Sequence, residues 1–157
     1  MKRTIRQAVG NGGFTMIEMI AVLVIIGIIA AVAVSRMSNT SAYDLASQLE
    51  VVKGHLRLAQ SRAMASGSLW GINFTSSTTY YLFQGAAPTT PVQLLGENNA
   101  TVNLTTKKSS LTINSVNSVA VPQSIAFDAY GSPGATTLPI NTSGGNITVT
   151  KNTGYIP

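Results

Sequence analysis

The chain changes from polar to apolar at Gly12-Gly13-Phe14-Thr15-Met16-Ile17-Glu18-Met19-Ile20. The apolar run behind this stretch continues to Val34, and Thr15 and Glu18 are its only clearly polar side chains. A carboxylate within such a run costs about 2.5–3.5 kcal/mol toward membrane insertion at the centre of a span, and less near the interface. Because that cost calls for a compensating role, Glu18 is a candidate functional residue.

The apolar run is long enough to cross a membrane. Its 21 residues, from Phe14 to Val34, would extend about 31 Å as a helix at 1.5 Å per residue, close to the ~30 Å hydrocarbon core of a bilayer. Three basic residues precede the run, and only Arg36 follows it closely. The positive-inside rule therefore predicts a single span with a cytoplasmic amino terminus and a translocated remainder.

The pattern Gly-Phe-Thr-x-Ile-Glu at residues 13–18, with its basic leader and apolar run, resembles the processing site of type IV pilins and type II secretion pseudopilins. In that family a dedicated peptidase cuts after the glycine, and the new amino-terminal Phe becomes N-methylated. The resemblance implies cleavage between Gly13 and Phe14 and N-methylation of Phe14. It also implies three partners: the prepilin peptidase, the bacterial inner membrane, and other pilin or pseudopilin subunits in a helical filament.

Glu18 would then have a role in assembly. The processed amine at Phe14 is cationic, and a carboxylate four residues along can neutralise the amine of a neighbouring subunit in a setting of low dielectric. Such pairing offsets desolvation only with good geometry. We therefore expect Glu18 to favour the correct register between subunits more than raw stability.

An ordinary secretory signal is the alternative interpretation. It would be cleaved near Ala33, at the small-residue sequence Ala31-Val32-Ala33, and would release a secreted β-domain binding protein or adhesin. The apolar run is longer than the usual ~7–15 residues of a signal-peptide core, and Glu18 is out of place at its start. These observations favour pilin-type processing.

A helical pattern continues beyond the span. Apolar residues recur at spacings of four, three, four, three and four in Leu45, Leu49, Val52, Leu56, Ala59 and Ala63. This period near 3.5 predicts an amphipathic helix that packs on a core and ends before Gly67, a left-handed cap. We expect one helix from Phe14 to about residue 65, without a kink at Ser35, where family pilins usually have proline. Gly54 costs ~1 kcal/mol relative to Ala within a helix, which close packing of a strand or a neighbouring helix would explain.

Beyond Gly67 the pattern becomes alternating, which is typical of strands. The predicted strands are 70–74, 80–83, 101–105, 111–116, 124–127, 137–140 and 147–150. The predicted fold is α+β: a long amino-terminal helix, apolar in its first half, whose second half packs on a carboxy-terminal antiparallel β domain. The predicted divisions are a leader (1–13), a transmembrane and assembly segment (14–34), an amphipathic continuation (35–66) and a β-rich periplasmic domain (67–157).

The carboxy-terminal part extends the resemblance. A helix ending Ala63 to Gly67, a strand bearing Trp70, and the stretch Ile125 to Pro133 are similar to H-type pseudopilins and FimT-type minor pilins. The resemblance implies a structural, minor subunit of a type IV pilus or a type II secretion pseudopilus.

The composition gives little support to catalysis or ligand binding. There are no cysteines and a single histidine, His55, so no catalytic constellation or metal-ligand cluster forms around it. We expect His55 to be a packing or surface residue, Asp128 to cap a turn, and the chain to have no cofactor, no metal and no enzymatic activity.

The positive charge belongs largely to the leader. The chain has a net charge of +5, and removal of Lys2, Arg3 and Arg6 leaves seven basic and five acidic residues, a net charge of +2. Lys107 and Lys108 are predicted to lie at a solvated hairpin tip, and the carboxy-terminal tail has no arginine. Nucleic acid is therefore not an expected partner.

Overall fold

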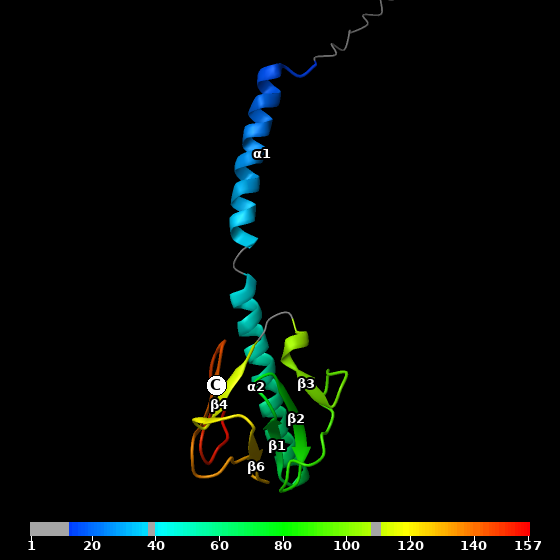
Figure 1. Ribbon diagram of the computed structural model, residues 1–157, viewed down its shortest axis with the longest axis vertical. Helices are drawn as coiled ribbons and strands as arrows, with labels where there is room; N and C mark the ends of the chain where they lie inside the picture. The colour runs from blue at the N-terminus through cyan, green and yellow to red at the C-terminus, as the bar shows by residue number, and fades with distance from the viewer. Residues whose placement is uncertain (1–12, 38–39, 108–110) are drawn as a thin grey trace, which may run out of the picture. The chain divides into compact units, whose positions relative to one another are not determined.

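The computed structural model describes residues 13–37, 40–107 and 111–157, which fall into two units, Met1–Asn39 and Thr40–Pro157 (Figure 1). The first unit contains one helix, α1 (Met16–Met37). The second contains helix α2 (Thr40–Ser66) and the β strands. Residues 1–12 of the predicted leader lie outside the described residues. Residues 38–39, through which the predicted single helix would have to continue, also lie outside them.

The predicted apolar stripe is the buried face of α2. Val52, Leu56, Ala59 and Ala63 are fully buried, and Leu45 and Leu49 pack against the same core. The helix ends at Ser66 because Gly67, with φ of +64°, takes the left-handed conformation that glycine adopts without a steric penalty. The predicted amphipathic helix and its cap are confirmed.

The first sheet is antiparallel and covers one side of α2. Its order is β3-β2-β1-β6, built from β1 (Trp70–Phe74), β2 (Thr79–Gln84), β3 (Thr101–Asn103) and β6 (Gln123–Phe127). Ile72 on β1 lies opposite Leu82 on β2 and Ile125 on β6, and all three are buried. A Cβ at Gly71 would meet the Ile125 carbonyl and the Phe83 ring. Glycine at position 71 therefore lets the strands and the ring approach closely.

The second sheet has the order β5-β4-β7-β8. Its strands are β4 (Ile113–Val116), β5 (Val119–Ala120), β7 (Leu138–Thr142) and β8 (Gly145–Val149). Both sheets contribute to one hydrophobic core, and α2 contacts β1, β6 and β8. The second unit is thus a helix packed on antiparallel sheets, as the predicted α+β class requires.

Several details differ from the sequence-based expectation, including the bounds of β7 and β8, which were predicted as 137–140 and 147–150. The strand predicted for 101–105 ends at Asn103, because the Asn103 carboxamide oxygen accepts from the Thr105 amide at 3.0 Å and begins the 3-10 turn η1 (Leu104–Thr106). The short strand β5 was not predicted. It follows a two-residue hairpin turn in which Asn117 and Ser118 both have positive φ, 51° and 64°. The strand predicted to begin at residue 111 begins at Ile113.

Gly54 is not explained by packing within the chain. It lies on the exposed face of α2, and no described atom comes within 4 Å of a Cβ built on it, apart from its own helix backbone and sequence neighbours. The suggestion that a strand of this chain packs closely on Gly54 is therefore wrong.

Candidate processing and assembly site

The Gly13–Phe14 peptide bond lies in exposed, non-helical chain just before α1. Gly13 has open space around it, and Phe14 is 78% exposed. The helix begins at Met16 rather than at the expected Phe14. A peptidase that binds extended chain can therefore reach this bond without unwinding a helix.

Thr15 sets the start of α1. The Glu18 amide donates to the Thr15 carbonyl at 3.1 Å and to its hydroxyl oxygen at 3.3 Å, and the Met19 amide also donates to the Thr15 carbonyl. Thr15 is therefore the N-cap, which satisfies amides that a helix otherwise leaves unpaired. Sequence reasoning missed this function, although Thr15-x-x-Glu18 ahead of an apolar run is the sequence signal of a capping box.

Glu18 occupies the first turn of α1. A carboxylate at a helix amino terminus interacts favourably with the macrodipole, by about 0.3–1 kcal/mol on an exposed surface. That gain is smaller than the cost of about 2.5–3.5 kcal/mol for a carboxylate at the centre of a span. If the first turn of α1 enters an apolar environment, helix stabilisation alone is too small to offset the cost of placing the Glu18 carboxylate there.

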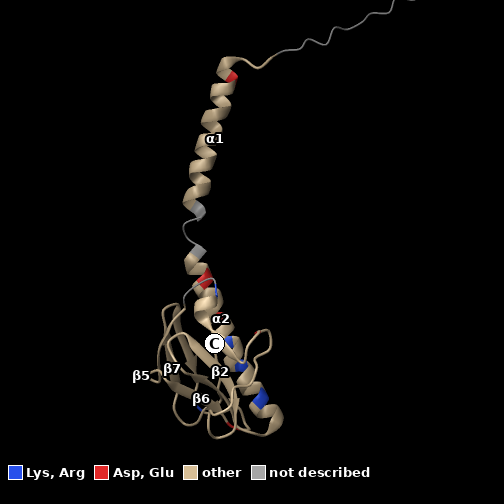
Figure 2. Ribbon diagram, turned by 45° about the vertical axis from the view of Figure 1, so that its right-hand side comes forward, with Lys and Arg blue, Asp and Glu red and all other residues tan. Residues whose placement is uncertain are grey.

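The rest of α1 presents apolar side chains on all sides. The 20 residues from Met16 to Ser35 have a mean hydropathy of 2.9, and none of the window is buried by the rest of the chain. The whole helix of 22 residues is about 33 Å long at 1.5 Å per residue. Figure 2 shows uncharged positions along almost all of α1. By length and composition, such a helix can cross a bilayer or pack among other apolar helices.

The helix passes through Ser35 without a break. The Ser35 hydroxyl donates to the Val32 carbonyl at 2.8 Å, and helical structure continues to Met37. Serine at position 35 therefore leaves helix α1 uninterrupted.

Two candidate residues of the second unit have structural partners. Asp128 caps a turn as expected: its Oδ1 accepts from the amides of Tyr130 and Ser132 at 2.9 Å each. Lys107 is not at a solvated tip. Its ammonium group pairs with Glu97 at 2.8 Å, because the connection between β2 and β3 brings that carboxylate to it. Lys108 lies outside the described residues.

Gly13, Phe14 and Glu18 thus lie in one continuous segment at the start of an apolar helix, an arrangement consistent with an amino-terminal membrane anchor. Residues 10–34 match the family model of the prokaryotic N-terminal methylation motif. The match shows a prepilin-type amino-terminal signal and supports the resemblance to the type IV pilin and pseudopilin family. Comparison with curated proteins and with solved structures gave no match.

Proposed function

We propose that this chain is a minor structural subunit of a type IV pilus or a type II secretion pseudopilus, cleaved between Gly13 and Phe14. One observation carries the proposal: an exposed, non-helical Gly13–Phe14 bond precedes a capped apolar helix with Glu18 in its first turn, and a methylation motif spans the same residues. The resemblance of Ile125 to Pro133 to minor subunits supports the finer assignment.

The precursor would be anchored in the bacterial inner membrane by α1. Basic residues ahead of the apolar run favour a cytoplasmic amino terminus, so the second unit would fold in the periplasm. In this role the chain has no catalytic activity, cofactor or metal of its own. Its partners are the prepilin peptidase, the membrane and other subunits.

Cleavage would create the groups that set subunit register. Hydrolysis of the Gly13–Phe14 bond leaves an ammonium group at Phe14, which carries the N-methyl group in the mature protein. Glu18 of one subunit would pair with this cation on a neighbouring subunit. Since removing one partner of a buried ion pair costs several kcal/mol, a misregistered subunit that leaves either charge unpaired is disfavoured.

The apolar surface of α1 would exchange lipid for neighbouring helices in the filament. Lipid tails are as apolar as leucine, so helix association depends on close packing rather than on the hydrophobic effect. Gly27, Ala30, Ala31 and Ala33 are small residues of α1 and permit such an approach.

Processing is tested by the mass and the amino-terminal residue of the mature protein, made in cells that contain a prepilin peptidase. We expect a start at Phe14 with one added methyl group. Gly13→Ser should abolish leader removal, whereas the matched control Gly12→Ser should be processed. Leader removal from Gly13→Ser at the wild-type level would contradict the proposed cleavage site.

The same measurement decides the alternative, a secreted β-domain binding protein or adhesin with a conventional signal. That protein would begin near Val34. Ala33 lies within the helix Met16–Met37, so a peptidase acting there would first have to unwind the last turns of α1. The exposed bond at Gly13 needs no such unwinding, which favours pilin-type processing.

A further inference from the structure

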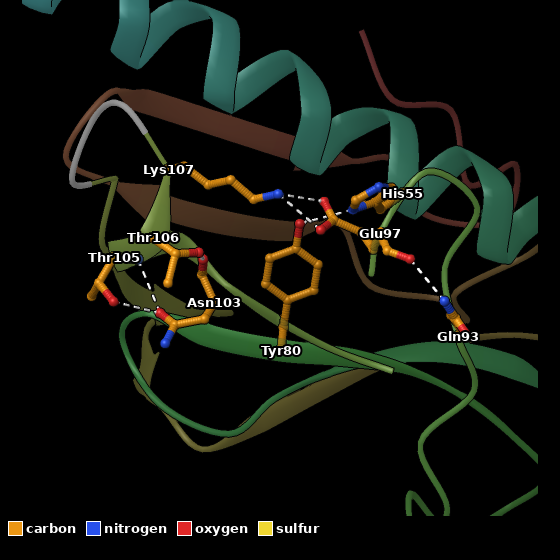
Figure 3. Close-up of polar contacts among 8 residues, drawn as sticks. All are labelled: His55, Tyr80, Gln93, Glu97, Asn103, Thr105, Thr106 and Lys107. Atoms are coloured by element: carbon orange, nitrogen blue, oxygen red, sulfur yellow. Dashed lines mark hydrogen bonds and ion pairs between the residues drawn. The ribbon is translucent and has the colours of Figure 1, made fainter. Parts of the chain in front are cut away.

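The second unit contains a polar cluster that the proposed assembly function does not use. It consists of His55 on α2, Tyr80 on β2, Glu97 on the connection between β2 and β3, and Lys107 just after η1 (Figure 3). His55 Nδ1 lies 2.8 Å from the Tyr80 hydroxyl. The Lys107 ammonium group donates to both Glu97 carboxylate oxygens, at 3.0 and 2.8 Å.

The cluster is largely shielded from water. Tyr80 is fully buried, and the side chains of Glu97 and Lys107 are only 12% and 31% exposed. Figure 3 shows the Glu97 carboxylate close to the His55 imidazole and the Tyr80 hydroxyl. An ion pair in such a position is more strongly coupled to its neighbours than a surface pair, because solvent screening is weaker.

The connection that carries Glu97 is residues 85–100. Its first half is held by the Gly85 amide, which donates to the Leu69 carbonyl at 2.8 Å, and by the Tyr81 hydroxyl, which donates to the Pro88 carbonyl at 2.6 Å. The Val92 amide donates to the Leu82 carbonyl at 2.7 Å, and the Leu94 side chain is buried in the core. The Glu97 amide donates to the Leu94 carbonyl at 3.2 Å. Leu95, which follows the buried Leu94 in the sequence, is 82% exposed. The Glu97–Lys107 pair and the buried Leu94 side chain therefore hold the second half of this connection.

A proton on His55 would disturb this arrangement. A doubly protonated imidazole has no acceptor, so its Nδ1 can contact the Tyr80 hydroxyl only as a donor. It would also place two cations, His55 and Lys107, beside one carboxylate in a half-buried cluster. Glu97 would then be shared between them, which weakens its two bonds to Lys107. Burial disfavours the charged imidazole more than Glu97 favours it, so the charge favours an open connection in which His55 is hydrated.

The surroundings keep His55 neutral at neutral pH. Burial lowers the pKa of His55 below its usual value of 6.5; the Glu97 carboxylate opposes this effect, and the Lys107 charge adds to it. Burial also raises the pKa of Tyr80, so its hydroxyl remains protonated. A histidine whose pKa is lowered by folding adds stability above its unfolded pKa of about 6.5, and that stability is lost as the pH falls through the folded pKa.

We propose that His55, Tyr80, Glu97 and Lys107 form a proton-sensitive latch that holds the β2–β3 connection against α2 near neutral pH and releases it in acid. Release frees Leu94 from the core beside the exposed Leu95. Acid would thus enlarge the apolar surface of this connection without unfolding the sheets.

The test uses the full-length protein in detergent micelles. His55 is the only histidine, so its imidazole NMR signal can be titrated without ambiguity. Hydrogen exchange of the Val92 and Glu97 amides, corrected for intrinsic rates, reports the closed connection. We expect a His55 pKa below 6.5. As the pH falls from about 6.5 to that lower pKa, the protection of these two amides should fall by up to about tenfold per pH unit and then level off, while the Ile147 amide in β8 stays protected.

The matched variant is His55→Gln, which retains a hydrogen-bonding side chain but does not titrate. Protection of Val92 and Glu97 in this variant should not change between pH 7.5 and pH 5. Three results would overturn the latch: a His55 pKa of 6.5 or above, constant protection in the wild type, or the same loss of protection in His55→Gln. The first two come from the wild type alone, so the test holds even if the variant folds poorly.

Discussion

The two helices are similar in length, with 22 residues in α1 and 27 in α2, yet they differ in what surrounds them. α1 buries none of its apolar window against the rest of the chain. α2 buries a single stripe, including Val52, Leu56 and Ala59, against the sheets. Charged residues follow the same division, since Lys53, Arg57 and Arg62 lie on α2, whereas Glu18 is the only charged residue of the α1 window.

This difference separates two tasks along one chain. The partners of α2 are already present in the folded unit, so its side chains determine the stability of the subunit. The apolar surface of α1 is not covered by the rest of the chain, so in the proposed function its side chains determine location and assembly. Substitutions in α2 should therefore change the stability of the subunit, whereas substitutions in α1 should change its assembly.

The largest effect is expected from Glu18→Ala in α1. The variant should still lose its leader, because the Gly13–Phe14 bond is unchanged, but its incorporation into filaments should fall at least tenfold. The reason is that the Phe14 ammonium group of a neighbouring subunit would lose its counter-charge in a setting of low dielectric. The measurement is the amount of the variant in purified filaments, divided by the amount of processed variant in the membrane.

Glu18→Gln is the matched control, because it keeps the size and the hydrogen-bonding capacity of the side chain while removing the charge. It should fail to assemble like Glu18→Ala. Wild-type incorporation of either variant would show that Glu18 is only a first-turn residue that stabilises the helix, an effect of about 0.3–1 kcal/mol.

The next effect is expected from Leu56→Ala in α2. Leu56 is fully buried in the core, and a leucine-to-alanine change at such a site costs about 2–5 kcal/mol through lost transfer energy and the remaining cavity. Denaturation followed by the fluorescence of Trp70, the only tryptophan, measures the free energy of unfolding of the second unit.

Leu23→Ala in α1 is the matched control for this measurement. Leu23 is 65% exposed, so the same chemical change should leave the unfolding free energy of the second unit within about 0.5 kcal/mol of wild type. A large loss of stability from Leu23→Ala would break the division of tasks between the two helices.

The regular parts of this fold could be predicted because each rests on local periodicity. The stripe from Leu45 to Ala63 and the alternation around Ile72 are patterns that a single buried face imposes. β5 could not be predicted, since Val119 and Ala120 are both exposed and their pairing depends on a hairpin turn with positive φ at Ser118. Pairing of an exposed strand of two residues depends on tertiary context, not on a sequence period.

The candidate site could be predicted in part for the same reason. Gly13, Phe14 and Glu18 lie within one short stretch, so the sequence alone brings them together. The cluster of His55, Tyr80, Glu97 and Lys107 comes from four separate segments of the chain, and no spacing in the sequence relates them. Only the tertiary fold brings these four segments together.

The smallest effect is expected from Gly54→Ala, and it makes the comparison sharper. Gly54 is exposed on α2 with open space for a Cβ, so alanine should stabilise the second unit by about 0.5–1 kcal/mol through its higher helix propensity. If Gly54 is retained only by chance, filament incorporation should equal that of wild type. If a neighbouring helix packs closely on Gly54, the same variant should be more stable as a subunit yet incorporated less, and α2 would then share the assembly task assigned to α1.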